Sequence, residues 1–271
     1  MLFRSIPTRQ TRSGELAMWK GCATAWAAQS GVAAAILARE GMTGPTAAFE
    51  GKDGVFDKVT GKFVLGPLGG ANKAFGIDRT NLKFFPSEYH SQAPSWIMLR
   101  LREKVKPDEV ASIDVQTYFT AWSEIGSEPE KWNPQTRETA DHSLPYLLSL
   151  AFIDGGIRAD SFSQERMRDP ALKALMSKIK ISENKSFTAR FPNELVTQIE
   201  ITTRAGQKVV ETAVYPKGHA KNPMTDADVE SKFHMACGEL LPRARRENLL
   251  KLLWNVEQAA NLDTLFELAK V

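Results

Sequence analysis

The fold of this chain is organised around one stretch, Lys83-Phe84-Phe85-Pro86-Ser87-Glu88-Tyr89-His90-Ser91-Gln92. An apolar, aromatic run stops at Pro86, which cannot continue a central strand because it has no backbone N–H to donate. A carboxylate, a phenol, an imidazole, a hydroxyl and an amide follow. The pattern predicts a short strand over 82–85 and a helix over 91–104, with His90 in the first turn. Such a corner can present polar side chains to a cleft, although a structural corner with a surface histidine has the same pattern.

The composition is that of an ordinary globular protein, and 271 residues can form one large domain or two modest ones. The formal net charge is only +3, with both signs mixed along the chain. Because no Lys/Arg run with interleaved aromatic residues is present, the sequence does not indicate a nucleic-acid partner. A mild positive balance would suit a small anionic substrate.

The two cysteines, Cys22 and Cys237, form no CxxC motif, so we expect neither a disulfide framework nor a zinc site. A reducing, cytoplasmic compartment fits this pattern. We expect no membrane association, because we identify no apolar run long enough to span a bilayer. The first fourteen residues contain Arg4, Arg9 and Arg12 without an acid, which imitates a mitochondrial transit peptide and leaves a mitochondrial location as the alternative.

The first part of the chain predicts one long helix followed by a loop. Residues 19–39 are rich in alanine, which favours a helix with small side chains on every face, buried against other helices. Gly41 is a suitable residue at its C-terminal end. Residues 41–76 are loop-like, and the glycine-rich piece 66–70 is no phosphate loop, because no Gly-Lys-Ser/Thr ending follows it.

From residue 110 the patterns predict alternating strands and helices. Strands are expected over 110–118, around Ile179 and Ile181, and in a hairpin of 194–203 and 208–214. Helices are expected over 139–153, 162–167 and 170–177, the last with Asp169 as its cap and Pro170 in its first position. Further helices are expected from Thr225 to the C-terminus, with Asp228 completing a capping box. The fold class is therefore α+β, a mainly helical domain into which an α/β unit is inserted.

The chain has four histidines, and no pair of them has the i, i+4 spacing of a helical metal site. His142 and Tyr146 lie one turn apart at the start of an apolar helix, where they could place an imidazole beside a phenol or simply belong to a capped helix start. Lys20 leads into an almost uncharged helix and needs a partner, an anion or a path to solvent. His219 and His234 are interpreted as structural or incidental.

Five segments, in this order, resemble the MmgE/PrpD family, whose members include 2-methylcitrate dehydratase and cis-aconitate decarboxylase. They are Thr11-Arg12-Ser13-Gly14-Glu15-Leu16-Ala17-Met18-Trp19-Lys20, Gly41-Met42-Thr43-Gly44-Pro45, the stretch 83–92, Ala140-Asp141-His142-Ser143-Leu144-Pro145-Tyr146, and Tyr215-Pro216-Lys217-Gly218-His219 through Asn222-Pro223-Met224-Thr225-Asp226. The form of the third segment is closest to the 2-methylcitrate dehydratase branch.

The resemblance implies a helical domain built from residues 1–79 and 219–271, with an α/β lid domain over 80–218. It implies a hydro-lyase that dehydrates a tricarboxylic hydroxy acid of the propionate (methylcitrate) pathway without a metal or cofactor, and it implies a homodimer. By the same resemblance, His90, Lys20 and Tyr146 are the catalytic residues. His90 would transfer protons, Lys20 would stabilise charge, and Tyr146 would donate a hydrogen bond or a proton. The expected substrate-binding residues are Lys83, His142, Ser91 and Gln92.

The sequence departs from the family pattern at its beginning. Family chains are longer, and their first helical region carries further acidic and histidine residues that have no counterpart here. We therefore expect a fragment that holds the C-terminal portion only. The alternatives are a non-catalytic remnant, a subunit that needs an N-terminal partner, or a related decarboxylase, isomerase or epimerase acting on a polycarboxylate.

Overall fold

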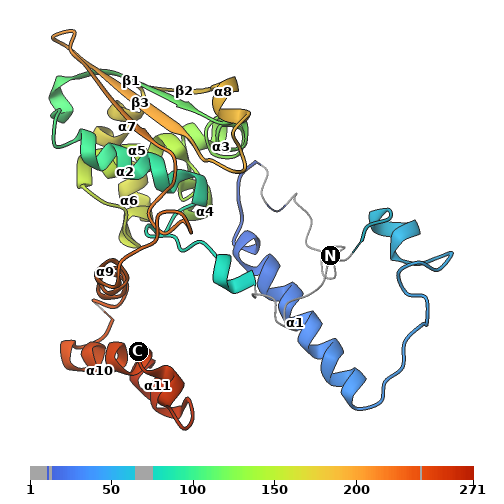
Figure 1. The fold of residues 1–271 in the computed structure, drawn as a ribbon. Helices are drawn as coiled ribbons and strands as arrows, with labels where there is room; N and C mark the ends of the chain where they lie inside the picture. Colours follow the sequence, from blue (N-terminus) through green and yellow to red (C-terminus); the bar gives the residue numbers. More distant parts are fainter. Residues whose placement is uncertain (1–10, 12–13, 65–75, 239) are drawn as a thin grey trace. The chain divides into compact units, whose positions relative to one another are not determined.

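The computed structural model describes residues 11, 14–64, 76–238 and 240–271. The chain divides into two compact units, Met1–Thr80 and Asn81–Val271 (Figure 1). Two predictions made from the sequence lie outside the described residues: the transit-like arginines near the N-terminus and the rejected phosphate loop at 66–70.

The first unit contains the predicted alanine-rich helix, α1 (Trp19–Arg39), drawn in blue in Figure 1. Its last turn is followed by Gly41, whose φ of +92° is the left-handed conformation that suits glycine after a helix end. Beyond it, the rings of Phe49, Phe56 and Phe63 pack together, with centroids 4.9–6.4 Å apart. A π-helical turn, Phe56–Thr60, holds the second of these rings.

The expected burial of α1 is wrong for the residues that the structure describes. Ala23 alone among the helix residues is buried, and Val32, Ile36 and Leu37 are exposed. The expectation that no apolar run could span a bilayer is also wrong, because α1 has the length and composition to do so. The core helix of a soluble protein passes the same test. The composition of a helix shows how apolar it is, but it does not show whether protein or lipid covers the helix.

The second unit is built on a four-stranded mixed sheet with the order β2-β1-β3-β4 (Figure 1). The strands are β1 (Val110–Thr117), β2 (Ile179–Glu183), β3 (Thr197–Thr203) and β4 (Lys208–Ala213). β1 pairs parallel with β2 and antiparallel with β3, and Ile113 faces both Ile179 and Ile201 across the ladder. All the predicted strands from residue 110 onward are present, and β3 and β4 form the predicted hairpin.

Helices cover one face of the sheet, so side chains alternate between a buried and a more exposed face. The main core joins α2 (Gln92–Leu101) and α5 (Leu144–Asp154) to the inner faces of β1, β2 and β3. α7 (Pro170–Met176) packs on α5 and begins at the predicted cap, Asp169. The remaining short helices of this region are α3 (Phe119–Ile125), α4 (Arg137–Ala140), α6 (Gln164–Met167) and α8 (Lys185–Thr188).

Two predicted elements differ in the structure. Residues 82–85 form no strand, because the N–H groups of Phe84 and Phe85 are bound by a side chain and not by a neighbouring strand. The predicted helix 139–153 is divided into α4 and α5 by a turn. Ser143 caps α5, and Pro145 in its first turn has no N–H to continue an earlier helix. His142 therefore lies before α5, not in its first turn.

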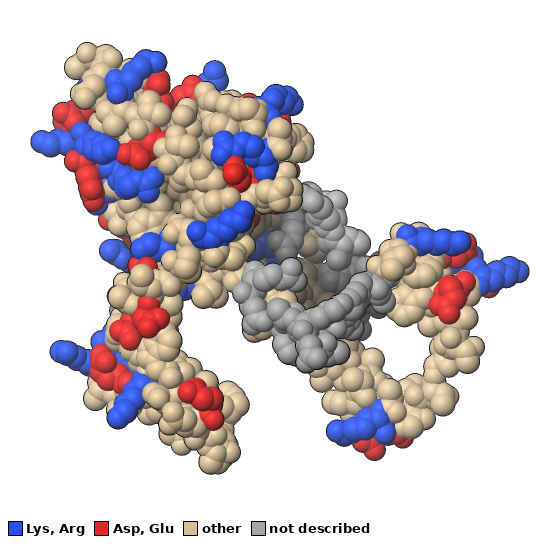
Figure 2. All heavy atoms as spheres, viewed as in Figure 1, with Lys and Arg blue, Asp and Glu red and all other residues tan. Residues whose placement is uncertain are grey.

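The chain ends in α9 (Asp226–Cys237), α10 (Arg243–Leu253) and α11 (Asp263–Ala269). Thr225 and Asp228 form the predicted capping box at the start of α9. These helices are assigned to the second unit, so their predicted return to the helical domain stays a prediction, as do the lid domain and its boundaries. Figure 2 shows both signs of charge mixed over the exposed face of this unit.

Candidate functional site

The corner at residues 83–92 is held together by the amide of Gln92. Its Oε1 accepts hydrogen bonds from the backbone N–H groups of Phe84 and Phe85, at 3.0 and 2.9 Å. Its Nε2 donates to the carbonyl of Phe85 and to Oγ of Ser87. The hydroxyls of Ser87 and Ser91 bond to each other at 2.8 Å. Gln92 and Ser91 are fully buried, so they shape this corner, and their predicted contact with a substrate would require the corner to open.

Glu88 places His90 and connects the corner to the turn before α5. Its Oε2 accepts the backbone N–H of His90 at 2.6 Å and so caps the 3-10 turn Tyr89–Ser91. Its own N–H donates to the carbonyl of Asp141 at 2.9 Å. Two segments of the chain that are about fifty residues apart in sequence therefore meet here, and they carry two of the predicted site residues, His90 and His142.

The ring of His90 lies among aromatic side chains. Its Nδ1 is 2.5 Å from the hydroxyl of Tyr118, and the Tyr118 ring is stacked on Phe191, with centroids 4.9 Å apart. Tyr89 contacts the ring edge-on. The His90 side chain is 14% exposed, so one part of it remains accessible. Aromatic side chains lower the local polarity and so strengthen the electrostatic interactions of a charged group placed beside them.

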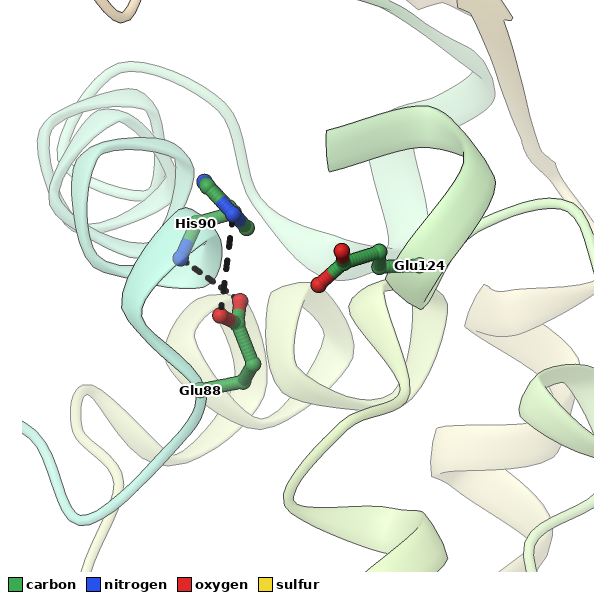
Figure 3. Close-up of side chains that lie close together, drawn as sticks. All are labelled: Glu88, His90 and Glu124. Carbon is green, nitrogen blue, oxygen red and sulfur yellow. Dashed lines mark hydrogen bonds and ion pairs between the residues drawn. The ribbon is translucent and has the colours of Figure 1, made fainter. Parts of the chain in front are cut away.

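The carboxylates of Glu88 and Glu124 lie near this ring (Figure 3). A nitrogen of His90 and one oxygen each of Glu88 and Glu124 lie within 4.8 Å of one another. Oε1 of Glu88 is 3.9 Å from Nε2 of His90. Glu124 comes from α3, a different element from the corner. We call these three residues the carboxylate–imidazole cluster.

The carboxylate–imidazole cluster has the donors that a divalent cation would need. One imidazole nitrogen and two carboxylate oxygens suit zinc or manganese, although the two glutamates would have to move closer for coordination distances near 2 Å. The expectation that no metal takes part stays a prediction. Without a cation, the same donors can hold or move protons near neutral pH.

Burial changes the acidity of the phenols of Tyr89 and Tyr118, which lie beside His90. Desolvation, followed by the nearby Glu88 carboxylate, raises the pKa of Tyr118 far above the ordinary tyrosine value. The same two causes raise the pKa of Tyr89 to about 12. Both phenols therefore keep their protons at any physiological pH, and neither can serve as a base.

Cationic groups lie beside the corner on the side of α9. Nζ of Lys83 donates to the carbonyl of Ser87 at 2.8 Å, and Lys232 donates to the carbonyl of Lys83. Burial, and then the charge of Lys83, lowers the pKa of Lys232. A recess of about 90 Å³ opens here, and it is lined by Phe84, Pro86, Arg158, Ala159, Lys232, Met235 and Ala236. Its two cations and apolar floor could accommodate a carboxylate with a short carbon chain.

The other predicted site residues are placed differently. His142 is paired through Nδ1 with the carboxylate of Asp141. Tyr146 is 1% exposed in the core, and its hydroxyl donates to the carbonyl of Ser161 at 2.7 Å. Burial raises the pKa of Tyr146 well above its ordinary value, so in this arrangement it supports α5. Lys20 lies on α1 in the first unit, so its place at the site stays a prediction.

Sequence reasoning missed Tyr118 and Glu124. Tyr118 is the last residue of the predicted strand 110–118 and follows the observed β1, and Glu124 lies in α3, the helix that comes next. The position where a strand gives way to a helix is a signal that could have been used. Nothing in the sequence indicates that this strand end faces the corner at His90, because the contact joins residues 28 positions apart.

The geometry described above joins a mixed sheet covered by helices to an imidazole that lies near two carboxylates. The MmgE/PrpD C-terminal domain matches residues 85–257, and the MmgE/PrpD N-terminal domain matches residues 2–67. The chain belongs to the MmgE/PrpD family. The match at 2–67 corrects the expectation that the chain holds the C-terminal portion only.

Several characterised proteins are similar to this chain. The mitochondrial 2-methylcitrate dehydratase of Yarrowia lipolytica is 30% identical over 181 residues, which cover 63% of this chain and 32% of that protein. The cis-aconitate decarboxylase of Homo sapiens is 27% identical over 137 residues, 51% of this chain and 28% of that protein. The alkylcitrate dehydratase phiI of a fungal species is 27% identical over 249 residues, which cover 84% of this chain and 47% of that protein. The matched regions thus span less than half the length of each relative.

Proposed function

We propose that the chain carries part of the active site of a lyase that removes water from a hydroxy polycarboxylate such as 2-methylcitrate. The observation that carries this proposal is the partly buried imidazole of His90, held against Tyr118 and flanked by Glu88 and Glu124. Two of the relatives are named dehydratases and one a decarboxylase. All three names support a lyase, and the two dehydratases support the removal of water.

The reaction needs three kinds of group, and the described residues supply candidates for each. A proton must leave the carbon next to a carboxylate, and another must reach the departing hydroxyl. His90 and the two glutamates are the groups suited to these transfers. Cations must hold the carboxylates and stabilise the charge that develops on them. Lys83, Lys232 and Arg158 beside the corner could do so, and Lys20 is the expected further cation.

The charges of the carboxylate–imidazole cluster limit how the substrate can bind. Glu88 and Glu124 would repel a substrate carboxylate, so the carbon and hydroxyl that react are expected near His90 while the carboxylates lie towards the lysines. We keep the predicted roles of His142 as a substrate-binding residue and of Tyr146 as an acid. The role of Tyr146 requires its side chain to move, because its hydroxyl donates to the carbonyl of Ser161.

The test is turnover by the purified chain. With 2-methylcitrate, we expect the absorbance of the unsaturated product to rise, and we expect His90→Gln to lower kcat about 10²–10⁴-fold. His234→Gln on α9 is the matched control, because it removes an imidazole from outside the cluster. Full activity of His90→Gln would refute this site.

Two alternatives are separated by the same assay. If the chain alone is inactive but gains activity when the N-terminal region of a longer relative is added, it is a subunit that needs a partner. If cis-aconitate releases carbon dioxide while 2-methylcitrate is unchanged, the chain is a decarboxylase, as the human relative's name would suggest. A homodimer, a role in propionate catabolism and a cytoplasmic location, with a mitochondrial one as alternative, remain part of the proposal.

A further inference from the structure

The contact between Tyr118 and His90 has a direction that the surrounding groups determine. The Tyr118 side chain is 1% exposed, so solvent cannot satisfy its hydroxyl. Among the described residues, Nδ1 of His90 is the hydrogen-bond partner of this hydroxyl, at 2.5 Å. The phenol has one hydrogen to donate, and a ring nitrogen of a neutral imidazole either donates or accepts.

The two directions differ in what they leave unpaired. If Nδ1–H donated to the phenol oxygen, the phenol hydrogen would be buried with no acceptor among the described residues, which is costly. If the phenol donates to Nδ1, both groups are satisfied. Burial and the charge of Glu88 raise the pKa of Tyr118, so the hydroxyl keeps the hydrogen that it donates.

The other side of the ring favours the same arrangement. A neutral imidazole that accepts at Nδ1 carries its own hydrogen on Nε2. Nε2 lies 3.9 Å from Oε1 of Glu88, and Glu124 contributes a second carboxylate to the same cluster. A positive N–H edge facing two carboxylates is favourable, whereas a lone pair facing them would not be.

We propose that Tyr118 is a positioning residue, which donates its hydroxyl hydrogen to Nδ1 of His90 and so fixes the neutral imidazole with its hydrogen on Nε2. The stack of Tyr118 on Phe191 holds the phenol ring in the plane that this contact needs. The phenol holds its hydrogen throughout and relays no proton.

The consequence for the reaction rests on the proposed function. With its hydrogen on Nε2, the nitrogen that faces the cluster carboxylates, His90 would meet a substrate bound at the cluster as a hydrogen-bond donor and not as the base that removes a C–H proton. A neutral imidazole can polarise a substrate oxygen in this way. The base is then one of the cluster carboxylates or a group outside the described residues.

The experiment reads the position of the hydrogen directly and needs no substrate. The full chain is labelled with ¹⁵N-histidine, and its imidazole signals are recorded about two pH units above the ordinary histidine pKa of ~6.5. The His90 signals are identified by their loss in His90→Gln. We expect the proton between the two rings to show no one-bond coupling to ¹⁵Nδ1, and we expect Nε2 to carry a directly bonded hydrogen. A one-bond coupling at Nδ1 would overturn the proposal.

Two matched variants add a second readout. Tyr118→Phe keeps the ring stack and removes one hydroxyl, so we expect the bridging proton to vanish and the Nδ1 signal to move. Tyr89→Phe removes a neighbouring hydroxyl that has no hydrogen-bond partner among the described residues, so the His90 signals should stay. If Tyr89→Phe moves them as much as Tyr118→Phe does, the effect is general packing and the proposal fails.

An activity measurement separates this proposal from the proposed function. If 2-methylcitrate is turned over, we expect Tyr118→Phe to lower kcat about tenfold with little change in KM, the pattern of an interaction used mainly in the transition state. If no turnover is found, with or without the N-terminal region of a longer relative, the proposed function fails for this chain, while the position of the hydrogen on the His90 ring is still decided by the spectra.

Discussion

At the scale of single residues, the stretch 83–92 contains two kinds of polar side chain that the sequence does not distinguish. Gln92 and Ser91 are buried and bond to the chain around them, whereas Glu88 and His90 remain partly accessible. The difference arises from direction: the first pair points back under the corner and the second pair points towards β1 and α3. Polar residues with similar sequence signals therefore differ in their capacity to meet a substrate.

Replacing Gln92 by leucine should destabilise the second unit by about 2–4 kcal/mol, because the N–H groups of Phe84 and Phe85 lose their acceptor in a buried site. Chemical denaturation of both proteins measures the difference. Gln164→Leu is the control, since Gln164 is exposed and makes one hydrogen bond, to the carbonyl of Gln135. Equal stability of the two variants would contradict the role given to Gln92.

At the scale of elements, the sequence predicts the ends of two helices and one hairpin turn correctly. The caps Asp169 and Thr225 and the hairpin turn at Gly206 are found where the patterns predict them. Each depends on residues within about four positions, so local chemistry is sufficient. The predicted strand 82–85 is wrong, because a strand needs a partner strand and this segment pairs with none among the described residues.

The cap of α9 should weaken in acid. Asp228 accepts hydrogen bonds from Nζ of Lys217 and from the N–H and hydroxyl of Thr225, and these hold its pKa at about 2, below the ordinary 3.8. A lowered pKa stabilises the fold above pH 3.8, and this contribution is lost as the pH falls through about 2. Titration of the Asp228 carboxyl carbon by NMR measures it.

Asp228→Asn should remove this part of the acid dependence, whereas Asp226→Asn should leave it in place. Asp226 is in the same first turn, but the capping hydrogen bonds of Thr225 go to the carboxylate of Asp228 and not to that of Asp226. An Asp228 carboxyl that titrates at the ordinary value would show that the bond to Lys217 is absent in solution.

Two glycines with positive φ should respond differently to substitution by alanine. At Gly206, φ is +81° and nothing lies within 4 Å of an added Cβ, so the cost is the left-handed backbone alone, ~1–2 kcal/mol. At Gly218, φ is +92° and an added Cβ would lie 2.0 Å from the carbonyl oxygen of Leu82. The loss there should be on the order of 3 kcal/mol or more.

The unfolding free energies of Gly206→Ala and Gly218→Ala, measured in urea, make the comparison. The larger effect at Gly218 has a structural cause, because its carbonyl accepts the N–H of Leu82 at 2.8 Å and ties the two ends of the α/β region together. A smaller effect at Gly218 than at Gly206 would show that these ends are not joined in this way.

At the scale of the whole molecule, the buried apolar clusters among the described residues all belong to the second unit. The three buried clusters draw their members from residues 84–215, and none includes a residue of α1. The first unit exposes apolar side chains on α1, including Val32, Ile36 and Leu37. Stability of the described chain therefore resides in the α/β region, since burial of apolar surface is the main source of folding free energy.

Residues 81–271 expressed alone should fold cooperatively, with a melting temperature close to that of the second unit in the full chain. Circular dichroism during heating and the dispersion of amide signals in NMR spectra measure this. Residues 1–80 alone should show no cooperative transition, because they form no buried cluster among the residues described. A loss of the transition in 81–271 would mean that the first unit is needed for the fold.

The sequence by itself determined the family, the α+β class, and most helices and strands from residue 89 onward. These follow from periodicity, caps and motifs, which act over a few positions or are carried by residue identity. Only the tertiary structure decided that Tyr118 and Glu124 meet His90, that Gln92 and Tyr146 have their polar groups occupied within the protein, and that α1 is largely exposed among the described residues. Those facts depend on which distant surfaces pack together, and a sheet that pairs β1 with β3 across some eighty residues brings together side chains whose spacing in the sequence carries no sign of the contact.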